Sequence, residues 1–163
     1  MLRRSVLLTV LAAAACAPAT PPPTLPGGPA GAVPTDPITA ARQNAAAFVG
    51  SPQAGKPAEA ARAIADIEFL AGAVPSDPRW QGQSGNAVPQ LFLARDQARS
   101  ALGIPRGADA QAVIDGLMSA ATALDANDRP GVARALPRNV FTAGPSDTSV
   151  LAFVPSCPVR PSV

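Results

Sequence analysis

The stretch from Pro57 to Ala73 restricts the folds that this chain can adopt. Its apolar residues recur at helical spacing and would cover two sides of a single helix. Phe69 lies roughly opposite the main apolar stripe and is flanked by alanines on its own side. The main stripe consists of Ala60, Ala63, Ile64, Ile67, Leu70, Ala71 and Val74. A helix that is apolar on two sides needs neighbours on both. The sequence therefore predicts a helical bundle in which residues 57–73 form the central helix.

Three further segments show helical spacing of apolar residues. One helix begins after Asp36 and stops at Gly50, one begins near Pro89 and ends at Gly103, and one runs from about 109 to 126. A shorter helix is expected between about 128 and 136. Frequent alanine lets helices approach closely. We therefore expect an all-α fold, a compact antiparallel bundle of about four main helices.

The bundle is expected to occupy residues 36–154, close to 120 residues, which is enough for one core. Residues 16–35 are dominated by Pro, Gly, Ala and Thr, a composition that favours extended, solvated backbone. We expect this stretch to be a disordered linker without a motif. Residues 155–163 are expected to form a flexible C-terminal tail.

The first sixteen residues have the layout of a bacterial export signal. Residues 1–4 are a short basic start, residues 6–15 are uncharged and largely apolar, and three alanines lead directly into Cys16. The apolar run of about ten residues is too short to cross a hydrocarbon core, which needs roughly 20 residues as a helix. We therefore expect residues 1–15 to be a signal peptide.

The segment Ala13-Ala14-Ala15-Cys16 resembles the lipobox of bacterial lipoproteins, with Ala13 where that class usually has leucine. The resemblance covers residues 1–16 only. It implies cleavage before Cys16 and attachment of lipid, including palmitate, to that residue, so that the protein is anchored to a membrane without spanning it. In that class an aspartate after the cysteine tends to retain the protein at the inner membrane, so Ala17 favours the outer membrane, facing the periplasm.

A second cleavage site overlaps the first. Ala15-Cys16-Ala17 is an A-x-A sequence, and ordinary signal peptidase could cut after Ala17. That cleavage would discard Cys16 and release a soluble periplasmic or secreted protein. Both alternatives place the helical domain outside the cytoplasm.

The charge balance argues against nucleic-acid binding. Of the 13 basic residues, two are Arg3 and Arg4, so the chain after residue 15 carries 11 basic and 11 acidic residues. No basic excess remains to neutralise phosphates, and five Phe and one Trp provide few surfaces on which bases could stack. We expect partners among envelope proteins, or a second copy of the chain, and no nucleic acid.

The chain has no histidine, which is the residue most often used for acid–base chemistry near neutral pH. A Ser-His-Asp or Cys-His arrangement is therefore excluded. Asp66 and Glu68 are the candidate carboxylates, but their spacing separates them around a helix, and we expect them to be solvated or paired with Arg62. Cys157 has no metal-ligating neighbours in sequence. We expect no enzymatic activity, cofactor or metal, and a structural or protein-interaction role.

One loop keeps a ligand-binding function open. Trp80, Gln81, Gln83 and Asn86 combine an aromatic face with amides, which is how a protein can bind a sugar ring or another small ligand. The alternative is that Trp80 plugs one end of the core, with its N–H bonded to a nearby carbonyl.

The sequence also suggests an interaction face on the helix that begins near Pro89. Phe92 is turned about 100° from Leu91 and shares its side with Arg95 and Arg99. We expect both arginines to be solvated and to surround a half-exposed Phe92. An apolar residue rimmed by arginine is common in protein–protein contacts.

Overall fold

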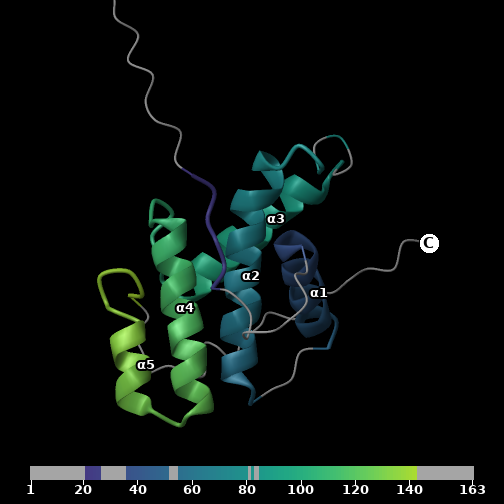
Figure 1. The fold of residues 1–163 in the computed structure, drawn as a ribbon. Helices are drawn as coiled ribbons and strands as arrows, with labels where there is room; N and C mark the ends of the chain where they lie inside the picture. Colours follow the sequence, from purple (N-terminus) through teal and green to yellow (C-terminus); the bar gives the residue numbers. More distant parts are fainter. Residues whose placement is uncertain (1–20, 27–35, 52–54, 81, 83–84, 143–163) are drawn as a thin grey trace, which may run out of the picture.

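The computed structural model describes residues 21–26, 36–51, 55–80, 82 and 85–142 (Figure 1). Within these ranges every regular element is a helix: α1 (Pro37–Gly50), α2 (Pro57–Ser76), α3 (Ala87–Ala101), α4 (Ala110–Asp125) and α5 (Arg129–Ala135). The prediction of an all-α helical bundle is confirmed. The segment 1–15, Cys16, Cys157 and the tail 155–163 lie outside the described residues.

The central position of α2 is also confirmed. α2 packs against α1, α3 and α4, while α5 packs against α4 (Figure 1). Phe69 and Leu70, which point to different sides of α2, are 5% and 4% exposed. Both apolar sides of the helix are therefore buried, as its sequence requires.

Three aspartates fix the starts of their helices. Asp36, Asp109 and Asp128 accept backbone hydrogen bonds at 2.9–3.0 Å from the N–H groups of Thr39, Ala112 and Gly131, respectively. These bonds satisfy donors that have no partner within the helix. These three aspartates therefore cap α1, α4 and α5.

α4 provides the most deeply buried side chains of the core. Val113, Ile114 and Leu117 are fully buried on the face that meets α2 and its neighbours. On another side, a Cβ added to Gly116 would lie 2.9 Å from the Phe141 ring and 3.0 Å from the Ala135 carbonyl oxygen. Glycine at 116 therefore allows the chain around α5 to approach α4 closely.

α3 differs most from expectation. It begins at Ala87, before Pro89, and the apolar side chains of Leu91, Ala94 and Ala98 along it are only partly buried. Arg99 is the one buried side chain of this helix. Its end is as expected: Gly103 has a φ of 64°, and the Ile104 N–H donates to the Arg99 carbonyl oxygen at 2.8 Å.

Residues 21–26 lie against the bundle. Thr24 hydrogen-bonds through its backbone to the Gln111 side chain of α4, and Leu25 packs against the core. Within the expected linker, residues 16–35, these six residues thus contact the helical domain. The physical reason is that Leu25 finds apolar partners and the adjacent backbone finds a side-chain amide.

Candidate interaction surface

The outer part of α3 exposes two large apolar side chains. Phe92 is 39% exposed and Leu93 is 52% exposed, whereas Val113, Ile114 and Leu117 of α4 are fully buried. α3 crosses behind α2 in Figure 1. We call Phe92, Leu93 and Arg95 the α3 patch.

Arg95 forms the polar rim of the α3 patch. Its guanidinium carbon lies 5.3 Å from the centre of the Phe92 ring, within the range of a cation–π contact. Its Nη2 lies 3.8 Å from Asp96 Oδ1, and Asp96 also pairs with Arg106 at 3.3 Å. The Arg95 Nε is buried and has no hydrogen-bond partner among the described residues. The patch therefore combines exposed apolar carbon with an arginine side chain that is 28% exposed.

Arg99 does not belong to this surface, contrary to expectation. It is 3% exposed, its Nε donates to Glu68 Oε2 at 3.0 Å, and its Nη2 pairs with Glu68 Oε1. Phe92 and Arg99 are seven residues apart and lie on the same side of α3. That side is buried at Arg99, near the C-terminal end of the helix, and exposed at Phe92, nearer its N-terminal end. The sequence pattern correctly placed Phe92 and Arg99 on one side of α3, but it could not show that α2 packs over Arg99 and leaves Phe92 exposed.

The remaining donors of Arg99 organise the loop after α3. Its Nη1 lies 3.2 Å, 2.7 Å and 3.1 Å from the carbonyl oxygens of Pro105, Arg106 and Ala108, respectively. These carbonyls accept hydrogen bonds from a charged group that Glu68 neutralises. Arg99 thus fixes α2, the end of α3 and the approach to α4 relative to one another.

The Trp80 region is partly built as expected. Trp80 is half-buried against the core, and the Arg42 guanidinium carbon lies 5.5 Å from its ring centre. Its Nε1 is buried without a hydrogen-bond partner among the described residues, so the expected carbonyl acceptor is not found there. Gln81 and Gln83 lie outside the described residues, and Asn86 is exposed at the start of α3 without a side-chain capping bond.

A pocket of about 220 Å³ adjoins Trp80 and is lined by Asp36, Thr39, Arg79 and Trp80. Arg79 bonds to Asp36 at 2.8 Å and to Asp77 at 2.5 Å. These Arg79 hydrogen bonds are the main reason that the pKa values of both carboxyl groups are lowered. The pocket wall thus places an arginine that two carboxylates share beside one aromatic ring.

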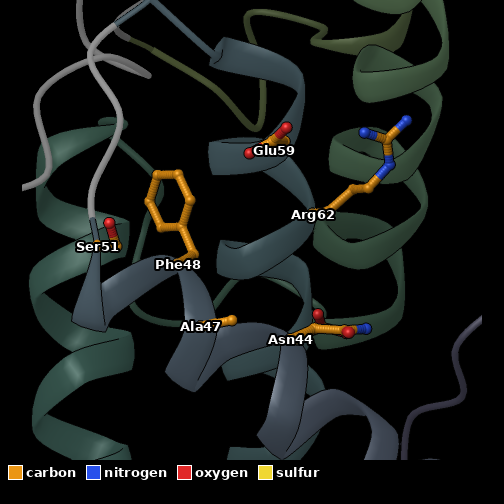
Figure 2. A pocket seen from close by; sticks show the side chains of 7 residues that line it. Asn44, Ala47, Phe48, Ser51, Glu59 and Arg62 are labelled. Atoms are coloured by element: carbon orange, nitrogen blue, oxygen red, sulfur yellow. The ribbon is translucent and has the colours of Figure 1, made fainter.

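A second pocket, of about 390 Å³, lies between α1 and α2 (Figure 2). It is lined by Asn44, Ala47, Phe48, Ser51, Glu59, Arg62 and Asp66. Figure 2 shows the Arg62 guanidinium turned away from Asn44 towards a neighbouring helix, and Arg62 pairs there with Asp125 of α4. The pocket therefore has Arg62 at its border and Asp66 in its wall.

Asp66 and Glu68 are both buried, which corrects the expectation that they are solvated or paired with Arg62. Asp66 is 5% exposed, and burial raises its pKa to about 6, while a hydrogen bond with Asn44 acts in the opposite direction. Glu68 pairs with Arg99. The sequence held part of the signal, because a helix that is apolar on two sides leaves little solvated surface for its polar residues.

No group of three or more Cys, Asp or Glu side chains in the described part of the chain could hold a metal ion. In the same ranges, no helix combines the length and apolarity needed to cross a membrane. Comparisons of the chain with known protein families, curated proteins and solved structures found no match.

Proposed function

We propose that this chain is a lipid-anchored protein of the bacterial cell envelope whose helical domain has a non-catalytic structural or protein-interaction role. The N-terminal layout, with a basic start, an apolar run and Cys16, supports the anchoring. The proposed location is the outer membrane, with the domain facing the periplasm.

The observation that carries the interaction role is the exposure of Phe92 and Leu93. Burying exposed apolar surface in a complex is favourable, at roughly 25 cal/mol per Å². Arg95, whose guanidinium lies over the Phe92 ring, adds a residue type that is enriched in protein–protein interfaces. The partner is another envelope protein or a second copy of the chain.

Crosslinking in intact cells tests the α3 patch. We expect Phe92→Ala to reduce the yield of a crosslinked complex, because it removes the aromatic centre of the contact. The substitution should destabilise the fold by clearly less than the roughly 3–5 kcal/mol typical of truncating a core Phe. Val49→Ala is the matched control, since Val49 is an apolar residue of α1 that is 52% exposed. Equal loss of complex in both variants, or unfolding of Phe92→Ala, would contradict the proposal.

Incorporation of labelled palmitate tests the anchor. Wild-type protein should be labelled and Cys16→Ala should not, because the thiol is the proposed attachment point. Mass spectrometry of the mature N-terminus separates cleavage before Cys16 from cleavage after Ala17. Equal labelling of the two proteins, or an N-terminus at Pro18, would refute lipidation and favour a soluble periplasmic or secreted protein.

We also propose a second candidate function, small-ligand or glycan binding at the Trp80 loop. The buried Trp80 Nε1 without an acceptor among the described residues, in a side chain that lines a pocket, favours it. Arg42 over the ring opposes it, since a stacking sugar would have to use another face or displace that side chain. The chain has a single tryptophan, so its fluorescence reports on Trp80 alone. A spectrum unchanged by cell-wall saccharides would exclude this function for them.

A further inference from the structure

Residues 21–26, with the sequence Pro-Pro-Pro-Thr-Leu-Pro, run between α2 and α4 and are drawn in purple in Figure 1. One side-chain amide binds both polar groups of the Thr24 backbone. The Thr24 N–H donates to Gln111 Oε1 at 2.8 Å, and Gln111 Nε2 donates to the Thr24 carbonyl oxygen at 3.1 Å. Gln111 therefore recognises an extended backbone in the way that a neighbouring strand would.

The Gln111 amide is held in this orientation by α4 itself. Its Nε2 also donates to Asp115 Oδ1 at 2.8 Å, one helical turn further along. Its Oε1 accepts a longer contact from Thr24 Oγ1 at 3.3 Å. The amide is thus oriented from the helix side, which reduces the entropy lost when a peptide binds.

Gly72 of α2 provides the second contact. A Cβ added at this position would lie 2.6 Å from both Cγ and Cδ of Pro23, so only glycine lets the proline ring lie so close to α2. Leu25, on the other side of Thr24, packs against the core. A proline ring, a backbone unit and a leucine are therefore contacted in succession.

We propose that this α2–α4 face, defined by Gly72, Gln111 and Asp115, is a recognition site for an extended proline-rich peptide. Residues 21–26 occupy it as an exchangeable ligand within the same chain. Proline-rich segments suit such a site because they are already extended before binding and their backbone groups are unpaired.

The contacts are of a kind that permits exchange. The hydrogen bonds between Thr24 and Gln111 are exposed to solvent, and Pro23 and Leu25 are only partly buried. Residues 27–35 connect the segment to α1, and a short connection keeps the local concentration of such a ligand in the millimolar range.

Docking of residues 21–26 shortens the greatest distance that the chain can span between Cys16 and the helical domain. This consequence rests on the lipidation of Cys16 proposed above. With the segment docked, residues 17–20 connect Cys16 to Pro21, and five steps of about 3.5 Å span at most roughly 17 Å. Released, the chain from Cys16 to Asp36 spans up to roughly 70 Å. The docked segment would therefore hold the domain close to the membrane.

Competition with a free peptide tests the site. The probe is the fluorescently labelled hexapeptide Pro-Pro-Pro-Thr-Leu-Pro, added to the purified protein. Thr24→Pro removes the backbone N–H that Gln111 binds and should empty the face. We expect this variant to bind the probe at least 10-fold more tightly than wild type does. Adding Gln111→Ala should abolish binding, and adding Gln43→Ala, which removes an exposed amide from α1, should preserve it.

Hydrogen exchange at the Thr24 amide tests occupancy in the native chain. Gly72→Ala should accelerate its exchange about 10-fold or more, whereas Gly50→Ala should not, since a Cβ at Gly50 meets nothing within 4 Å. Protection that rises with protein concentration would mean that a second copy supplies the segment, which overturns the proposal. Failure of the probe to bind Thr24→Pro at millimolar concentration would also overturn it. Neither measurement involves lipid, so the outcome is independent of palmitate labelling.

Discussion

Arg99 is the residue on which three parts of the bundle converge. Its guanidinium contacts Glu68 in α2 and the carbonyl groups of the loop that leads into α4. Taking two charges out of water is expensive, and their attraction offsets this only where the hydrogen bonding is nearly complete. The hydrogen bonding of the Arg99 guanidinium is nearly complete. Removal of the Glu68 charge would therefore leave the Arg99 charge buried and uncompensated.

We expect Glu68→Gln to lower the free energy of unfolding by about 3–5 kcal/mol, because the substitution leaves Arg99 buried without its counter-charge. Asp125→Asn is the matched control. It removes one carboxylate charge from the pair with Arg62, whose side chains are 39% and 53% exposed, and should change stability by less than about 1 kcal/mol. Chemical denaturation of the three proteins measures both effects. Similar losses in the two variants would show that Arg99 is not buried as a charge.

At the scale of helices, contact between α4 and the chain around α5 depends on the absence of a side chain at Gly116. Gly116→Ala adds a methyl group against the Phe141 ring and the Ala135 carbonyl. Overpacking of this kind typically destabilises by about 1–3 kcal/mol, and the higher helix propensity of alanine offsets up to about 1 kcal/mol of that.

We therefore expect a net loss of about 1–2 kcal/mol for Gly116→Ala, measured by thermal or chemical unfolding. Gly50→Ala, at the end of α1, has open space around the added Cβ and should be neutral or slightly stabilising. Equal tolerance of alanine at both glycines would mean that α4 does not approach Phe141 and Ala135 so closely.

The helices could be predicted from sequence because their evidence is local. The spacing in α2 and α4 and the caps Asp36, Asp109 and Asp128 all lie within the elements that they define. The contacts of the candidate sites are not local. Glu68 and Arg99 are 31 residues apart, and Thr24 and Gln111 are 87 apart. Periodicity shows which side of a helix is apolar, but not which part of that side a neighbouring helix packs against. In α3 the two residues on one side differ in this respect, because Arg99 is buried and Phe92 is exposed.

At the scale of the whole molecule, Asp66 links stability to pH. In the folded protein its pKa is raised to about 6, against an ordinary value of 3.8. Between these values the folded state holds a proton that the unfolded chain has released, so the free energy of unfolding falls as pH rises. The stabilisation from this group is complete below about pH 4 and is lost above about pH 6. Glu59 and Arg62 line the same pocket, and Asn44 bonds to the carboxyl group.

We expect Asp66→Asn to gain stability relative to wild type as pH rises from 4 to 7, by an amount on the order of 3 kcal/mol. The difference between the two proteins is the useful quantity, because Asp36 and Asp77, whose pKa values are lowered, contribute equally to both. Chemical denaturation at several pH values measures this difference. Parallel stability curves for the two proteins would contradict the burial of Asp66.

The docked segment has a consequence for the order in which the molecule assembles. Its hydrogen bonds join Thr24 to Gln111 across 87 residues, and its binding face exists only after α2 and α4 have packed. Closing so long a loop carries an entropic penalty that grows with loop length, and a few solvent-exposed hydrogen bonds offset little of that penalty early in folding. We therefore expect the first described residues of the chain to be among the last to reach their native position, so that protection of Thr24 marks completed folding.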